Sequence, residues 1–277
     1  MPDPSPLGII AGAGQFPAQV ARGARETGRR VIIAGFTGHT DPALAAEADH
    51  FTLLHLGQLT KLLDFFHCHG VTELCLAGAI SKPKALDFRP DMRAVKLLFT
   101  LRGKGDDALF KAVTAELARE GFTVLRASAF VPGLAAPEGV LTRRAPTDEE
   151  MDDIRFGWPI ARTMGSLDIG QLIVVKSGIV VAVEAMEGTD ATLERGGQLG
   201  GAGCTAVKIF KPGQDERIDQ PAIGPKTIAV MAKHTYACLA FEAGNTLLFD
   251  RDETVRLADG AGIAMIGLPA FWVGESV

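Results

Sequence analysis

Two acid-rich segments in the second half of the chain carry residue types suited to phosphate chemistry. The first, Glu187-Gly188-Thr189-Asp190, follows the apolar run 179–183, and the second is 211–221, with Lys211, Arg217 and Asp219 among its charges. Carboxylate oxygens are the ligands that Mg²⁺ prefers, and lysine and arginine neutralise phosphate. The pattern indicates a magnesium-dependent site for a phosphate ester, although the same charges also suit two solvated surface loops.

The spacing within these segments suggests individual roles. Gly188 lets the backbone approach a ligand, and the Thr189 hydroxyl can donate to a phosphate oxygen. Pro221 favours an extended backbone just before it, so alternation sends Arg217 and Asp219 to the same side of the segment. We therefore expect one metal-and-phosphate cluster, made by Glu187, Asp190, Lys211, Arg217 and Asp219.

The elements that must position these residues read as an α/β protein with two domains. In the first half, apolar runs that end in glycine alternate with amphipathic stretches, the pattern of β-α-β units around a parallel sheet. The second half opens with Thr147 before three acids, the start of a capped helix, and continues with mixed strands and helices. We expect an N-terminal Rossmann-like domain at 1–130, a linker at 131–146 rich in Pro, Gly and Ala, and a C-terminal mixed α/β catalytic domain at 147–277.

Two glycine-containing turns in the first half are candidate phosphate contacts. Gly12-Ala13-Gly14-Gln15 follows the first strand and opens a helix, as in the start of a dinucleotide-binding fingerprint. Pro17 stands where a third glycine would be, and no acid ends the second strand at Ala34-Gly35-Phe36, which weighs against a nicotinamide-dependent oxidoreductase. Lys104-Gly105-Asp106 precedes another helix, where Lys104 offers a positive charge and Asp106 can cap.

Composition excludes several classes of protein. A net charge of −5 and a single Tyr beside two Trp argue against a nucleic-acid-binding surface. The four cysteines show no paired spacing and read as reduced thiols of a cytoplasmic protein. No signal peptide or run long enough to span a membrane is expected.

Surface contacts are suggested in two places. Arg89, Arg93 and Lys96 would share one helical face and are interleaved with apolar residues, a combination suited to an anionic lipid or to the inner membrane surface, or simply to an ordinary amphipathic helix. Phe271-Trp272-Val273 is a small apolar patch that would serve a homodimer.

Several of these segments together resemble the LpxI family, the UDP-2,3-diacylglucosamine pyrophosphatases of lipid A synthesis that lack a calcineurin-like fold. The resemblance is carried in order along nearly the whole chain by the segments 8–17, 104–107, 168–171, 182–190 and 211–224. Glu187 to Asp190 match the family's EGTD without departure. In the family's R-x-D-x-P segment this chain has Gln220 where leucine is usual.

The resemblance implies magnesium-dependent hydrolysis of UDP-2,3-diacylglucosamine to UMP and 2,3-diacylglucosamine 1-phosphate (lipid X), with the lipid nucleotide held between two domains. The family's essential aspartate falls on Asp219, and we expect Asp190 and Glu187 to help it hold Mg²⁺. The residues expected to contact the substrate are Gly12, Gly14, Gln15, Lys104, Asp106, Gln171 and Thr189. Two other hypotheses remain: a nicotinamide-dependent oxidoreductase and a non-catalytic protein that binds nucleotide sugars or lipids.

Overall fold

The computed structural model describes residues 5–80, 88–99, 106–215, 217 and 220–272. The chain divides into two compact units. Unit one comprises Met1–Pro132 with Asp215–Ile218, and unit two comprises Gly133–Gln214 with Asp219–Val277. The predicted α/β class is confirmed, with a parallel sheet in unit one and a mixed sheet in unit two.

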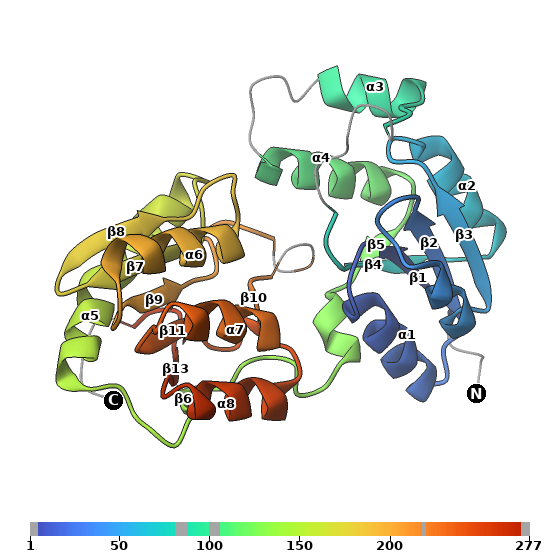
Figure 1. The fold of residues 1–277 in the computed structure, drawn as a ribbon. Helices are drawn as coiled ribbons and strands as arrows, with labels where there is room; N and C mark the ends of the chain where they lie inside the picture. Colours follow the sequence, from blue (N-terminus) through green and yellow to red (C-terminus); the bar gives the residue numbers. More distant parts are fainter. Residues whose placement is uncertain (1–4, 81–87, 100–105, 216, 218–219, 273–277) are drawn as a thin grey trace. The chain divides into compact units, whose positions relative to one another are not determined.

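Unit one is built on a five-stranded parallel sheet in the order β3-β2-β1-β4-β5 (Figure 1). Its strands are β1 (Leu7–Ala11), β2 (Val31–Phe36), β3 (His50–Leu54), β4 (Glu73–Ala77) and β5 (Thr123–Val124). Its helices are α1 (Phe16–Glu26), η1 (Pro42–Glu47), α2 (Leu59–Cys68), α3 (Met92–Phe99), α4 (Asp106–Arg119) and η2 (Ala127–Phe130). β1 and β2 are buried throughout, so they read as continuous apolar runs.

Alternate residues of these strands feed two separate cores. One face of the sheet packs on α1, where Ile9 meets Val20 and Ala24. The other face packs on α2 and α4, where Ile32 meets Leu63 and Leu117. Two covered faces are the condition under which an all-parallel sheet is stable.

Unit two contains a six-stranded mixed sheet in the order β6-β13-β11-β9-β7-β8, and a two-stranded parallel sheet made by β10 and β12. The strands are β6 (Gly139–Val140), β7 (Leu172–Lys176), β8 (Ile179–Val183), β9 (Thr205–Lys208), β10 (Ala222–Ile223), β11 (Cys238–Glu242), β12 (Leu247–Leu248) and β13 (Ala264–Leu268). The helices are α5 (Asp148–Ser166), α6 (Thr189–Gly200), α7 (Pro225–Lys233) and α8 (Arg251–Gly260).

Helices cover both faces of this six-stranded sheet. α5 packs on one face, where Ile154 and Trp158 meet Val207 and Ala240. α6, α7 and α8 cover the other, where Leu193 and Ile228 join the same core. α5 begins as predicted, with a capping box in which Thr147 accepts from the Glu150 N–H and the Glu150 carboxylate accepts from the Thr147 N–H.

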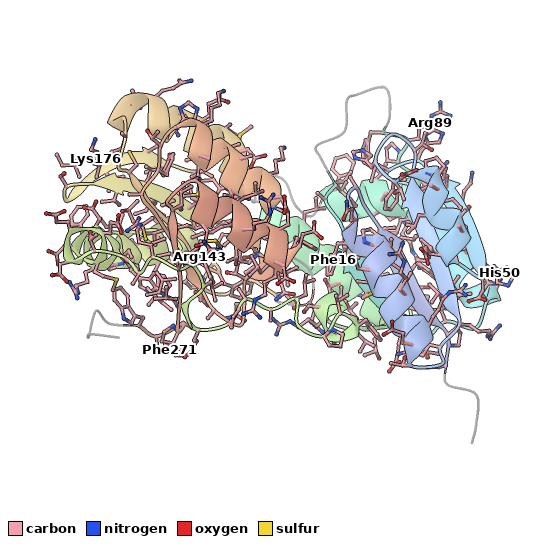
Figure 2. The ribbon with its side chains drawn as sticks, turned by 60° about the horizontal axis from the view of Figure 1, so that its bottom comes forward. Phe16, His50, Arg89, Arg143, Lys176 and Phe271 are labelled. Carbon is pink, nitrogen blue, oxygen red and sulfur yellow. The ribbon has the colours of Figure 1, made fainter. Side chains whose placement is uncertain are left out.

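The structure differs from the sequence-based expectation at two surface features, the basic face near α3 and the apolar patch at 271–273. Arg89 is exposed and lies before α3 rather than on it (Figure 2), and Arg93 pairs with Glu116 and Glu120. Trp272 of the expected dimer patch stacks edge-on against Trp158 of its own unit, with ring centroids 5.6 Å apart, whereas Phe271 is exposed (Figure 2). Val273 lies outside the described residues. In the part of the chain that the structure describes, no helix is both long and apolar enough to cross a membrane.

Candidate functional site

Three charged side chains are buried at one end of the six-stranded sheet. Strands β8, β9, β11 and β13 run in the same direction, so their carboxyl ends meet at one edge, and β7, between β8 and β9, is antiparallel to both (Figure 1). Lys208 ends β9, Glu242 ends β11 and Glu184 follows β8, and these side chains are only 3%, 1% and 6% exposed. We call these three residues the charged edge. Burying charges is costly unless they are paired, which makes this edge the leading candidate for a functional site.

On the side of the sheet covered by α6, a single hydroxyl connects two of these charges. The Lys208 Nζ donates to the Thr189 Oγ1 over 2.8 Å, and that hydroxyl lies 2.9 Å from the Glu184 Oε1, to which it donates. The other Glu184 oxygen accepts from the backbone N–H of Gln171 at 3.4 Å. Two partners thus fix Thr189 within a partly buried polar network, and its role as a phosphate donor stays a prediction.

The same place is the start of a helix. Thr189 is the first residue of the 12-residue α6, and the preceding Gly188 has a positive φ of 80° that favours glycine. The backbone N–H groups at a helix start and the helix dipole attract anions, and Lys208 adds a full positive charge. Within the described residues the buried Gln171 Oε1 has no hydrogen-bond partner. The arrangement is chemically suited to hold a phosphate group.

The two acids of this turn that were predicted to bind magnesium form salt bridges with two different basic side chains. Glu187 pairs with Arg195 at 2.5 Å, and a hydrogen bond from its own backbone N–H together with the Arg195 guanidinium lowers the pKa of Glu187. Asp190 pairs with Lys226 at 2.6 Å, an interaction that raises the pKa of Lys226. The two carboxylates thus have different partners, Arg195 and Lys226.

The predicted magnesium site is therefore incomplete in the described part of the chain. No group of three His, Cys, Asp or Glu residues there is placed to hold a metal ion. Asp219, the third predicted ligand, lies outside the described residues. A site built from Glu187, Asp190 and Asp219 thus depends on Asp219, and it stays a prediction.

The predicted cations of the 211–221 segment also have acidic partners. The Lys211 Nζ lies 2.6 Å from Asp168 Oδ1, in unit two. Arg217 donates to both carboxylate oxygens of Asp215, at 2.8 and 2.5 Å, and thereby lowers the pKa of Asp215. The role of Lys211 and Arg217 in stabilising the charge of the diphosphate stays a prediction.

In unit one, the first glycine of the predicted phosphate loop serves backbone packing. The Gly12 N–H donates to the Ala77 carbonyl and the Ala13 N–H to the Ala79 carbonyl, so neither is free for a phosphate. A Cβ on Gly12 would lie 2.5 Å from the Ala79 oxygen, which explains the glycine. Gly14 is exposed, with φ of 93° and open space around it, and Gln15 beside it is also exposed. A substrate contact at this loop would fall to Gly14 and Gln15.

Two further predicted contacts of unit one are Lys104 and Asp106. Lys104 lies outside the described residues, as does the side chain of Asp106, although its backbone begins α4.

Sequence reasoning did not single out Lys208, Glu184, Glu242 or Arg162. The local sequence marks Lys208 only as a charged residue at the end of the short apolar strand β9. Glu184 lies within the 182–190 segment, yet the neighbouring Glu187 and Asp190 were preferred because they share a turn with Thr189.

Comparison with known proteins agrees with the predicted family. Residues 6–134 match the LpxI N-terminal domain and residues 137–266 the LpxI C-terminal domain. A UDP-2,3-diacylglucosamine pyrophosphatase LpxI from Caulobacter vibrioides is 36% identical over 276 residues, which cover 95% of this chain and 97% of that protein.

Two further similarities are more limited. A bifunctional purine biosynthesis protein PurH from Roseobacter denitrificans is 31% identical over 140 residues, 46% of this chain but only 24% of that protein. The ADP complex of N5-carboxyaminoimidazole synthetase from Staphylococcus aureus covers 66% of this chain and 42% of its own, at 15% identity and a TM-score of 0.26, too low to support an argument. The two domain matches and the nearly full-length relative confirm the prediction, and the chain belongs to the LpxI family of enzymes.

Proposed function

We propose that this protein hydrolyses the diphosphate of UDP-2,3-diacylglucosamine and releases UMP and 2,3-diacylglucosamine 1-phosphate in the synthesis of lipid A. The observation that carries this proposal is the 36% identity to the Caulobacter pyrophosphatase over 95% of this chain and 97% of that protein. The LpxI domain matches at 6–134 and 137–266 extend over both units and include the charged edge.

The charged edge has a role in this reaction. Lys208 and the start of α6 bind oxygens of the diphosphate, and the Thr189 hydroxyl donates to one of them once the substrate displaces a present partner. Glu184 holds Thr189 and the Gln171 N–H in place. Such a site acts through positioning and electrostatic stabilisation, with no covalent intermediate. Lys211 and Arg217 spread the negative charge that builds on the departing UMP.

Magnesium is part of the proposal. Asp219, with Asp190 or Glu187, would hold the ion, which when bound supplies positive charge against the diphosphate oxygens. The support is the resemblance of Arg217-Ile218-Asp219-Gln220-Pro221 to the family's R-x-D-x-P segment. Asp190 and Glu187 would have to exchange Lys226 and Arg195 for the ion.

We further propose that the protein works in the cytoplasm at the inner membrane surface, where a diacylated substrate is found. Exposed Met92 and Phe99 on α3, with Lys96 on the same helix and Arg89 before it, support this contact. A homodimer remains a proposal that rests on the exposed Phe271.

The test is a thin-layer assay of purified protein with labelled UDP-2,3-diacylglucosamine, with Mg²⁺ or with EDTA. Wild type is expected to release UMP in Mg²⁺ only, and Asp219→Ala to bind the substrate but to lose at least about 100-fold in turnover. Binding without product by wild type under every condition would favour the non-catalytic alternative. Near-normal turnover by Asp219→Ala would remove Asp219 from the mechanism.

A further inference from the structure

Glu242 is the member of the charged edge that the proposed reaction does not yet use. It ends β11, is 1% exposed, and accepts hydrogen bonds at both carboxylate oxygens. Oε2 accepts from Arg162 Nη1 at 3.1 Å and from the Phe210 N–H at 3.2 Å, and Oε1 accepts from Asn245 Nδ2 at 2.8 Å. A buried carboxylate with donors on both oxygens is held in one orientation.

These bonds connect α5 to the segment that carries the predicted catalytic residues. Arg162 belongs to α5, and Phe210 directly precedes Lys211 at the start of the segment. Asn245 accepts at its backbone carbonyl from Gln220 Nε2 at 3.3 Å, at the end of the segment. Glu242 therefore links Arg162 to Phe210 directly, and to Gln220 through Asn245.

Arg162 keeps part of its guanidinium unused. Only Nη1 bonds to Glu242, and within the described residues Nε and Nη2 have no hydrogen-bond partner, although the side chain is just 29% exposed. Arg144, in the same unit, bonds through Nε and both Nη atoms to Glu150 and to backbone carbonyls. Arg162 is oriented by an acid and, in contrast to Arg144, retains donors for a ligand.

We propose that Arg162 binds a phosphate oxygen of the diphosphate and that Glu242 is the positioning residue that aims it. This inference rests on the proposed function, since it assigns Arg162 to the same substrate. Two arguments favour it: the pair lies at the carboxyl end of parallel strands, where ligands of such sheets bind, and the planar guanidinium suits phosphate. Arg162 then faces the diphosphate from the α5 side of the sheet and Lys208 from the α6 side.

The simpler alternative is that Arg162 only neutralises Glu242. The two differ in what they predict for ligand binding by a folded variant. Arg162→Ala is expected to lower kcat/KM about 100-fold. Arg162→Lys should recover only part of this loss in kcat/KM, because lysine keeps the positive charge but lacks the paired N–H donors of the guanidinium. Added guanidinium ion should partly rescue Arg162→Ala, a response that a structural role would not give.

Two further variants separate positioning from contact. Glu242→Gln keeps one acceptor oxygen and should raise KM about 10-fold, more than it lowers kcat, because the guanidinium loses its charged anchor. Arg155→Ala is the matched control: Arg155 is also on α5 and pairs with Asp152 at 2.7 Å, away from the charged edge. It should retain full activity.

A second readout does not depend on turnover. Isothermal titration with inorganic pyrophosphate should show binding by wild type and by Arg155→Ala, and at least about tenfold weaker binding by Arg162→Ala, with circular dichroism confirming that each variant is folded. If wild type binds pyrophosphate through Arg162 but does not hydrolyse UDP-2,3-diacylglucosamine, the proposed function fails and this inference stands. If wild type hydrolyses the substrate and folded Arg162→Ala matches it in both turnover and pyrophosphate binding, this inference alone is overturned.

Discussion

A lysine from a neighbouring strand contacts each end of helix α6. The helix dipole stabilises the positive charge of one lysine and opposes that of the other. The Lys176 Nζ, at the turn of the β7–β8 hairpin (Figure 2), donates to the carbonyls of Gly200 and Ala202 at 2.6 and 2.7 Å. These carbonyls lie at the C-terminal end, where the helix dipole favours a cation. The Lys208 Nζ lies at the N-terminal end against Thr189, where the same dipole opposes it.

The difference separates a residue placed for stability from one placed for binding. Lys176 satisfies the carbonyl of Gly200, the last residue of α6, which has no helical partner. Lys208 is 3% exposed and sits beside a positive helix end, an arrangement that costs stability unless an anion is near. Glu184 is connected to Lys208 through the Thr189 hydroxyl. A diphosphate bound at the start of α6 would place anionic oxygens beside this lysine, which is why we assign Lys208 to the substrate.

The largest expected effect comes from Lys208→Met, which removes the charge and keeps the length of the side chain. We expect kcat/KM to fall about 1,000-fold, measured by release of UMP, because the diphosphate loses a buried cation. The free energy of unfolding, measured in urea, should fall by no more than about 1 kcal/mol, since Glu184 keeps its two hydrogen bonds. Near-normal hydrolysis by this variant would place the diphosphate elsewhere.

The next effect concerns the hydroxyl between Lys208 and Glu184. Thr189→Val should lower kcat/KM about 10-fold and cost about 1 to 3 kcal/mol of stability, because two buried polar groups lose a partner. Thr189→Ser retains the hydroxyl and serves as its control. Near-normal kcat/KM in Thr189→Val, or a loss in Thr189→Ser as large as that in Thr189→Val, would contradict the special role of the hydroxyl.

At the other end of α6, Lys176→Met should affect stability only. Loss of the bonds to Gly200 and Ala202 is expected to cost about 1 kcal/mol in urea unfolding. Its kcat/KM should equal that of wild type. A large loss of activity without a change in stability would contradict the contrast drawn between the two lysines.

The smallest effect is on thiol reactivity. Cys68 is exposed, whereas Cys75, Cys204 and Cys238 are buried, and burial raises the pKa of Cys75 to about 12. At neutral pH a disulfide reagent should therefore label Cys68 first in the native protein, as read by peptide mass spectrometry, since the thiolate is the reactive form. Rapid labelling of Cys75 in folded protein would contradict the described core of unit one.

Cys204 extends this test to the Lys176 end of α6. Its Sγ lies 3.2 Å from the Gly201 carbonyl, burial raises its pKa, and the charge of Lys176 counters part of that rise. Lys176→Met therefore raises the thiol pKa further, which by itself slows labelling. Faster labelling of Cys204 in this variant would then report opening of the helix end, the outcome that we expect.

Much of the fold follows from local sequence patterns. Continuous apolar runs predicted the buried strands of the five-stranded sheet, and Thr147 with Glu150 predicted the start of α5. Ser177-Gly178 is also a pair that suits a tight hairpin turn, and both residues have positive φ values there, of 51° and 71°. These features depend on neighbouring residues, which is why one sequence suffices to find them.

Helix α6 was not predicted, because its glycines weaken any local helix signal. The packing explains them: a Cβ on Gly196 would lie 2.7 Å from the Val174 side chain, and one on Gly197 would lie 2.3 Å from that of His234. Since these contacts come from distant parts of the chain, the helix that positions Thr189 becomes visible only in three dimensions.

The charged edge was hidden for the same reason. Arg162 and Glu242 are 80 residues apart, and Lys208 is 19 residues from Thr189. The sequence directed attention to the acids of a turn, Glu187 and Asp190, which the structure shows in surface ion pairs. Pairing across a sheet edge brings together residues that no short motif contains.

The most direct test of the account is a crystal structure of the protein with a UDP-2,3-diacylglucosamine analogue whose bridging diphosphate oxygen is replaced by methylene. We predict that a phosphate oxygen lies within hydrogen-bond reach of the Lys208 Nζ, next to Thr189 and the start of α6. A diphosphate bound away from the carboxyl end of β9, with the Lys208–Thr189–Glu184 contacts unchanged, would contradict the central claim.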